Sequence, residues 1–435
     1  MDMLQNLLEK TLKQVPRIVL EKRLAERFKA VGLKVTKATT RAAAEHILSG
    51  KLQGEDFKLP GEGVVQITDE DLDFVVKGTE KFYSERYEDM LLESAHRTAD
   101  TIYEGLTKQW PQHGKLLDGD IREFRERVEG RWGVALGKLR MLLALAREWA
   151  HLVEERRSRE RGAKRNCLEE VMLRLHVRAC QVTNEIVVLL ENGLADGAMA
   201  RWRTLHEIAV VSAVIAKYGE DIAERYMHFQ VVDSFVSMEA YERDYAGLGY
   251  KPLSKRTVAK IRRDHAKLIE RFGVQFGKKN GWAAHHLNSK SVDFIALEKE
   301  AGETFMRSPY RWASENVHAG PKGAYSRMGN LNKPGHYLAG VSNAGLADPG
   351  QHAAVSLAEI TLLNIGESVV FDDLVMASII ARLEIEIPQD SAMHTTSYYS
   401  MSRSFARQGR RHDVPFRPPA VAPVRSTTSH RSPSV

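Results

Sequence analysis

The segment from Asn166 to Gly193 constrains the fold more than any other part of the chain. It reads NCLEEVMLRLHVRACQVTNEIVVLLENG, and its apolar residues recur at intervals of three and four. This period places them along one face of an α-helix. Asn192 and Gly193 then supply residues that commonly end helices. The sequence therefore predicts a long core helix.

The same spacing extends over most of the chain, which predicts an all-α protein. A threonine pair, Thr39-Thr40, is a candidate cap for the second helix, and Thr68 with Asp71 forms a capping-box pattern. A serine precedes the helix expected in SVDFIALEKEAG (291–302). Helices are expected at residues 3–30, 39–49, 68–108, 120–158, 166–191, 196–218, 220–246, 254–272, 303–318 and 352–383.

Other segments lack this period. The short stretch VVQI (64–67) is expected to be extended, and WPQHGKLLDGD (110–120) is rich in turn residues. GWAAHHLNSKS (281–291) is predicted as a loop. Residues 319–350 contain seven glycines and three prolines, which predicts a long surface loop.

These patterns predict two helical domains and a tail. Apolar periodicity disappears in EERRSRERGAKR (154–165), where a solvated charged linker is the commoner role and a phosphate-binding strip the rarer one. We therefore expect an N-terminal helical domain of unknown role at 1–160 and an antiparallel helix bundle at 165–388. The Arg/Ser/Pro-rich composition of 389–435 predicts a disordered tail.

The charge of +6 belongs to the tail. Residues 402–435 contain seven arginines and one aspartate, which together account for the whole excess. Residues 1–401 are therefore neutral overall, and polyanion binding by the folded part would require local clustering of charge. The tail is either a solvated extension or a segment that attracts nucleic acid or an acidic partner.

Composition also indicates where the chain resides. Cys167 and Cys180 are the only cysteines, which excludes a disulfide framework and fits a reducing cytoplasm. The longest apolar stretch, 208–216, is about half of the roughly 20 residues that a membrane helix needs. A soluble, cytoplasmic protein without a membrane partner is expected.

Sequence motifs for cofactor or metal chemistry are missing. The chain lacks a phosphate-binding glycine loop and a nucleophile elbow, so no cofactor is expected. The Glu-x-x-His pairs of Glu93 with His96 and of Glu315 with His318 fall in different predicted domains and do not complete a dinuclear site. The adjacent histidines at 285 and 286 are expected to be solvated, and we predict no metal site.

Arg311 and His318 form the most specific candidate for catalysis. Seven residues of helix place both side chains on one face, about 10 Å apart along the axis. An imidazole can exchange protons near neutral pH, and a guanidinium can hold phosphate oxygens. Such a pair suits metal-independent RNA cleavage, and a symmetric homodimer would supply a second histidine. The alternative is that His318 only caps the helix.

An arginine followed after four to six residues by a histidine, near the end of a helix in a bundle, resembles the HEPN superfamily. Many members are dimeric ribonucleases of toxin and phage-defence systems, so the resemblance implies RNA as the substrate. Residues 311 and 318 match this spacing at its long limit, and Arg201 with His206 also satisfies it. Trp312 departs from the family, which usually has a polar residue there.

A broader resemblance covers about residues 165–375. The segments ENGLADGAMARWRTLHE, GWAAHHL and SENVHAGP resemble an uncharacterised family of bacterial helical proteins. They draw attention to Arg203, Glu207, Trp282 and Ser314. Arg203 and Glu207 are either phosphate-binding and orienting groups or a structural ion pair. Trp282 and Ser314 are candidate substrate contacts, and a tryptophan in such a bundle is otherwise a core residue.

Three classes of function are therefore considered. The first is a HEPN-like endoribonuclease with His318 as general acid and base, Arg311 and Arg203 holding phosphate, and Glu207 orienting an arginine. The second is a non-enzymatic helical module that binds a protein or a nucleic acid. The third is other chemistry in a groove of the bundle. His176 and His206, on apolar helix faces, are expected to be core histidines with satisfied hydrogen bonds.

Overall fold

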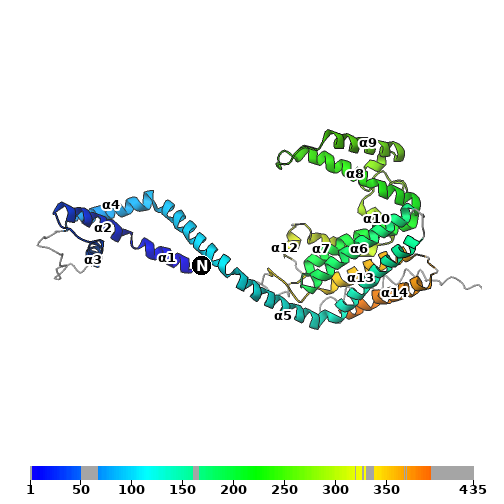
Figure 1. Cartoon of the computed structure of the whole chain (residues 1–435), viewed down its shortest axis with the longest axis horizontal. Helices are drawn as coiled ribbons and strands as arrows, with labels where there is room; N and C mark the ends of the chain where they lie inside the picture. Colours follow the sequence, from blue (N-terminus) through cyan, green and yellow to red (C-terminus); the bar gives the residue numbers. More distant parts are fainter. Residues whose placement is uncertain are drawn as a thin grey trace, which may run out of the picture. The chain divides into compact units, whose positions relative to one another are not determined.

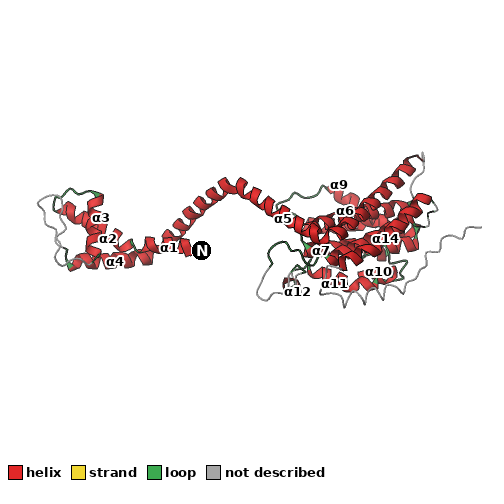
Figure 2. Cartoon of the chain, turned by 90° about the horizontal axis from the view of Figure 1, so that it is seen from below, coloured by secondary structure: helices red, strands yellow, loops and turns green. Residues whose placement is uncertain are grey.

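The computed structural model describes residues 2–49, 67–159, 166–318, 320–325, 328–329, 338–366, 368 and 370–392. Every regular element in these ranges is a helix, as predicted (Figures 1 and 2). The chain divides into two compact units, Met1–Leu117 and Asp118–Val435. The sequence placed this boundary at 160–165. It lies earlier because the apolar residues between Val128 and Trp149 belong to the core of the second unit.

The N-terminal unit is built around helix α2 (Val15–Ala30), against which α3 (Lys37–Leu48) and α4 (Asp69–Glu85) pack. The helix expected at 3–30 is divided into α1 (Asp2–Leu12) and α2, because Pro16 lacks an N–H and favours a helix start. The core of the unit is small and aliphatic apart from one phenylalanine: Leu20, Leu24, Phe28, Ala43, Ala44 and Val75.

The caps of these helices follow the predicted chemistry only in part. Helix α3 begins two residues earlier than expected, and Thr36 is its cap, because the Thr36 hydroxyl accepts the N–H of Thr39 at 3.2 Å. The predicted pattern of Thr68 and Asp71 is confirmed: the Asp71 carboxylate accepts the Thr68 N–H at 3.1 Å. The start of α4 is thus fixed by its own third residue.

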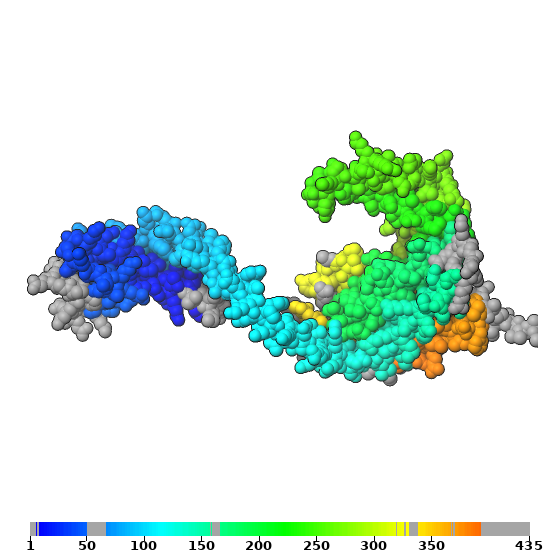
Figure 3. Space-filling model, viewed as in Figure 1, coloured from blue at the N-terminus to red at the C-terminus, as the bar shows by residue number. Residues whose placement is uncertain are grey.

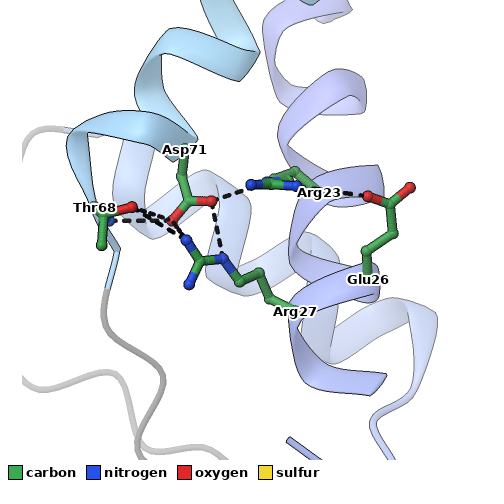
Figure 4. Close-up of polar contacts among 5 residues, drawn as sticks. All are labelled: Arg23, Glu26, Arg27, Thr68 and Asp71. Carbon is green, nitrogen blue, oxygen red and sulfur yellow. Dashed lines mark hydrogen bonds and ion pairs between the residues drawn. The ribbon is translucent and has the colours of Figure 1, made fainter. Parts of the chain in front are cut away.

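Asp71 also joins α4 to α2 (Figure 4). Its carboxylate is 1% exposed and accepts hydrogen bonds from Arg23 Nε at 2.9 Å and from Arg27 Nε at 3.0 Å. Burial alone would raise the pKa of Asp71, but the hydrogen bonds from Thr68 and the two arginines outweigh it and lower that pKa. One carboxylate therefore holds two arginines of α2 in place inside the unit.

Helix α5 (Tyr87–Arg159) corrects the prediction of a turn at 110–120. It continues through Pro111, Gly114 and Gly119. Proline costs about 3 kcal/mol and each glycine about 1 kcal/mol in a helix interior, but most residues around them are good helix formers. The turn residues were therefore outweighed by the long helical segments on both sides.

The C-terminal unit is a helix bundle with a single large core. Helices α6 and α7 pack against each other and against α13, which also contacts α14. The second half of α5 contributes Trp132, Leu139 and Leu142 to the same core. The helices of this unit are α6 (Cys167–Glu191), α7 (Ala195–Tyr218), α8 (Glu220–Asp244), α9 (Lys255–Phe272), α10 (Phe294–Ala301), α11 (Arg307–Glu315), α12 (Pro321–Tyr325), α13 (Ala347–Ile365) and α14 (Phe371–Ala392), with 3₁₀ turns η1 (Val274–Gly277) and η2 (Thr304–Met306).

Helices α6 to α9 have nearly the predicted bounds, whereas later elements differ. Helix α10 is capped by Asp293, which accepts the Ala296 N–H at 2.8 Å, and not by the preceding serine. The helix expected at 352–383 is two helices, because Gly366, at φ +57°, ends α13. The loop expected at 319–350 contains the short helix α12 and the first turn of α13.

Helices α8 and α9 form an antiparallel pair that stands out from the bundle (Figures 1 and 3). An aromatic contact joins the pair, because Phe235 stacks on His265 with ring centroids 4.0 Å apart, and Phe229 of α8 meets Phe276 of the following turn η1 edge to face. No residue of α9 is buried, so most of its polar surface faces water. We call α8, α9 and their connection, residues 220–272, the arm.

Several predictions concern residues outside those that the structure describes. These are 64–66 of the expected extended stretch, 160–165 of the charged linker, and 393–435 of the predicted tail. Residues 389–392 complete α14 instead of belonging to the tail. Within the described ranges, no helix combines the length and the apolar character that crossing a lipid bilayer requires.

Candidate functional site

Arg203 and Glu207 lie one turn apart on α7, as predicted, and Tyr310 of α11 completes their cluster. Arg203 Nη2 lies 3.3 Å from Glu207 Oε1, and the Tyr310 hydroxyl donates to that same oxygen at 2.6 Å. The Arg203 guanidinium lies over the Tyr310 ring, 5.0 Å from its centroid. Glu207 thus accepts a hydrogen bond from Tyr310 and forms an ion pair with Arg203, and both contacts hold it in place.

Tyr310 is a poor candidate for proton transfer near neutral pH. Burial and the hydrogen bond to Glu207 raise its pKa to about 12. The phenol therefore stays protonated and serves as a donor. Its ring packs against the guanidinium of Arg307, 5.5 Å from the centroid, as well as against that of Arg203. The tyrosine links α11 to α7.

A second, buried network lies beside this cluster. His206 Nε2 is 3.1 Å from Glu298 Oε1, and Arg307 Nη1 donates to Glu298 Oε2 at 2.8 Å. The side chains of His206 and Glu298 are 1% and 2% exposed. His206 was expected to be a satisfied core histidine; it is buried, but its Nδ1 has no hydrogen-bond partner among the described residues. The network ties α7, α10 and α11 together.

Arg311 and His318 are not placed on one helix face. Helix α11 ends at Glu315, and His318 follows it in a bend, with its backbone N–H 3.2 Å from the Ser314 carbonyl. The predicted helix to residue 318 is therefore wrong, and the distance derived from helix geometry does not apply. Both side chains are exposed, and neither makes a hydrogen bond or ion pair with another described residue. The structure does not assemble them into a pair.

The remaining candidates have structural contacts. Trp282 is 3% exposed and packs edge to face on Tyr226, so it is not available as an outer stacking surface. The Ser314 hydroxyl donates to the Tyr310 carbonyl at 3.0 Å. His176 is fully buried beside the Thr361 hydroxyl at 3.1 Å, and burial lowers its pKa to about 4. Its predicted role in the core is confirmed.

Metal ligands do not gather in the described part of the chain, where no group of three or more His, Cys, Asp or Glu side chains could hold an ion. The two adjacent histidines differ from the prediction that both are solvated. His285 is exposed, but the His286 side chain is 13% exposed and lies 3.2 Å from Asp221. Burial lowers the pKa of His286.

The arm carries the clearest concentration of charge, and sequence reasoning missed it. Helix α9 contains seven lysines and arginines and two acidic residues. Four of the basic residues recur at i, i+4, i+7 and i+11, which puts them on one face over about 16 Å of helix. We call this face the basic stripe; it consists of Arg256, Lys260, Arg263 and Lys267. All four side chains are exposed.

The charge of the stripe is hardly compensated. Arg263 lies 3.8 Å from Asp264, and the other three have no ion-pair partner among the described residues. Two further arginines of α9 behave differently, because Arg262 and Arg271 pair with Glu239 and Glu224 of α8. The helix therefore uses some basic residues to bind α8 and presents others to solvent. A count of charge along 251–279 could have located the stripe from sequence.

Tyrosines occupy the end of the arm. Tyr241 stacks near both Tyr245 and Tyr250, with ring centroids 6.1 and 6.4 Å away. Its hydroxyl donates to the Lys251 carbonyl at 2.9 Å, which fixes the connection between α8 and α9. Tyr250 is 61% exposed. An open aromatic ring thus lies at the start of the basic helix.

Residues 169–336 match a protein-family model described as a family of unknown function (DUF5677). The match begins within α6 and includes α7 to α12, so it contains both the Arg203 cluster and the arm. It confirms an uncharacterised domain in the region where the sequence suggested one. None of the curated proteins and none of the solved structures that were compared matches the chain.

Proposed function

We propose that this chain is a non-enzymatic helical module that binds single-stranded RNA through the arm. The basic stripe of α9 is the observation that carries the proposal. Its four guanidinium and ammonium groups follow one face of a solvent-exposed helix, and three of them have no ion-pair partner in the described chain. Such a line of charge neutralises successive phosphates and releases their counterions.

The tyrosines at the end of the arm favour a single strand over a duplex. A base that is not paired can stack on an exposed aromatic ring, and Tyr250 offers such a ring beside Lys251. Phosphates would then follow the stripe away from that position. Bases in a duplex are already stacked and paired, so the tyrosine would add little to duplex binding.

Binding without cleavage fits the arrangement of the former catalytic candidates. Glu207 is engaged by Arg203 and Tyr310, and Tyr310 stays protonated because its pKa is raised to about 12. Arg311 and His318 lie on either side of a helix end. A general acid–base mechanism needs such groups in fixed mutual geometry. The polar cluster is better explained as a support for α7 and α11.

Fluorescence anisotropy with a labelled single-stranded RNA tests the proposal. The variant Arg256→Gln, Lys260→Gln, Arg263→Gln, Lys267→Gln should bind about 100-fold more weakly at low salt, because it loses four phosphate contacts. A matched control replaces four exposed basic residues on other helices of the same unit, Arg147→Gln, Arg178→Gln, Lys299→Gln and Arg382→Gln. It should retain binding within about threefold, since it lowers the net charge equally but leaves the stripe intact.

The same samples decide between binding and the ribonuclease hypothesis. Gel analysis should show intact RNA after incubation with the wild type and with His318→Ala. Cleavage by the wild type that His318→Ala abolishes, without loss of thermal stability, would replace this proposal with the HEPN-like enzyme. Equal weakening by the stripe variant and its matched control would reject the stripe as the binding surface. Single-stranded DNA of the same sequence shows whether the sugar contributes.

A further inference from the structure

A cavity of about 740 Å³ opens on the N-terminal unit, away from the Asp71 cluster. One wall is a single face of α2: Ile18, Lys22, Ala25 and Lys29 recur at helical spacing. From residue 18 to residue 29 this face spans about 16 Å, or three turns. The other wall comes from the connection to α3 and from its first turns, and includes Leu33, Lys34, Val35, Lys37 and Thr40.

The rim of the cavity is basic and uncompensated. Lys22, Lys29, Lys34 and Lys37 line it, all four are exposed, and none has an ion-pair partner among the described residues. Glu21 is the one acidic residue among the described residues of the lining, and Arg17 binds it at 2.6 Å. Arg23 and Arg27 on the same helix differ from these lysines, because both bind the carboxylate of Asp71.

The apolar part of this lining, which we call the floor, is aliphatic. Ile18, Ala25, Leu33 and Val35 contribute to the lining, and Ile18 is 53% exposed. No aromatic side chain is among the described residues that line the cavity, so these residues offer no surface on which a nucleic-acid base could stack. A ligand that covered this floor would bury apolar area while its negative charges met the lysines.

We propose that this cavity is the docking groove for an acidic amphipathic helix of a partner protein. Such a helix would place leucine-like side chains on the aliphatic floor, at i, i+3/i+4 and i+7, and its carboxylates against the four lysines. The three-turn length of the α2 face fits a partner helix of similar length. A nucleic-acid strand would use the lysines but leave the apolar floor uncovered. This site is independent of the arm.

Binding of a synthetic peptide to the full chain tests the groove. The probe is a fluorescein-labelled peptide of about 15 residues, with leucine and glutamate at helical spacing. We expect Lys22→Glu, Lys29→Glu, Lys37→Glu to weaken binding more than about tenfold, because like charges would then face each other. Ile18→Asp should weaken it about fivefold by placing a charge on the floor.

Three controls make the outcome decisive. Lys10→Glu, Lys13→Glu, Lys81→Glu makes the same change of charge at exposed positions outside the cavity and should leave affinity unchanged. A scrambled peptide of the same composition should bind at least about tenfold more weakly, since it cannot present one apolar face. The glutamine versions of the three cavity lysines test the same contacts if the charge-reversed variant has a lowered thermal stability.

The proposal would be overturned by several results. One is equal binding of the scrambled peptide, which would mean that charge alone attracts the probe. Another is equal weakening by the control variant. A third is a single-stranded oligonucleotide of the same net charge that binds the N-terminal lysines more tightly than the peptide, because the cavity would then be a nucleic-acid site. Absence of measurable peptide binding to the wild type would also reject the groove.

Discussion

The polar cluster between α7, α10 and α11 and the basic stripe of α9 use the same kinds of side chain in opposite ways. In the cluster, Arg307 meets Glu298, and Glu298 also meets His206, so charge is compensated within the fold. On the stripe, Lys260 and Lys267 face water without an acidic partner in the described chain. Compensated charge joins helices, whereas uncompensated charge is available to another molecule.

Among the variants that test this contrast, Glu298→Gln should have the largest effect. The change removes the carboxylate shared by the buried His206 and by Arg307, whose side chain is 39% exposed, and we expect it to lower the free energy of unfolding by about 3 kcal/mol. Urea denaturation measures the loss. Glu239→Gln is the matched change on the arm, where the exposed pair with Arg262 should be worth less than about 1 kcal/mol. Similar losses for the two variants would contradict the distinction between interior and surface charge.

Glu384 of α14 sharpens the contrast because it is a half-buried carboxyl beside another acid. Burial, with a smaller contribution from Glu303, raises its pKa to about 7 from an ordinary 4.5. The folded state therefore favours the protonated carboxyl over the carboxylate. The free energy of unfolding is highest below pH 4.5 and falls as the pH rises through about 7, because the carboxyl must then ionise in a partly buried position. Glu384→Gln should be more stable than the wild type by about 2 kcal/mol at pH 8 and by little at pH 5. Thermal unfolding at both pH values checks this, and an equal difference at both would contradict it.

Tyr250 tests whether exposed residues of the arm bind RNA. Tyr250→Ala should weaken RNA binding about tenfold because one stacked base loses its platform, while the stability of the fold should be unchanged. Tyr250→Phe keeps the ring and should bind like the wild type. Loss of binding in both variants would show that the hydroxyl, and not stacking, matters. Anisotropy titrations at one fixed salt concentration compare the three proteins.

Tyr310→Phe should have the smallest effect of these variants. It tests the polar cluster, in which charge is compensated within the fold. It removes the hydroxyl that donates to Glu207 but keeps the ring between Arg203 and Arg307. We expect a loss of about 1 kcal/mol in the free energy of unfolding and no change in RNA binding. A large fall in RNA affinity would mean that the cluster, and not only the arm, contacts the ligand.

Much of the architecture could be predicted from local sequence. The three-and-four spacing of α6 and the cap residues Asn192 and Gly193 are local signals, and the structure confirms them. The continuation of α5 through Pro111 and the early end of α11 were missed, because both depend on a balance between local preferences and surrounding packing. Local sequence therefore predicts the ends of helices less well than their interiors.

The candidate sites were less predictable than the helices. Glu298 and Tyr310 are about 90 to 100 residues away from their partners on α7, and no spacing rule joins them. Arg203 and Glu207 were found because i and i+4 positions share a helix face. The stripe was detectable as a local charge excess, but its use depends on which face of α9 packs on α8, and the structure supplies that.

The dependence of RNA affinity on salt concentration tests the central claim most directly. If the four residues of the basic stripe each contact a phosphate, the slope of log K against log salt should become shallower by about 3 when all four are replaced by glutamine. The control variant with four replacements on other helices should keep the slope of the wild type. An unchanged slope in the stripe variant would contradict RNA binding by α9.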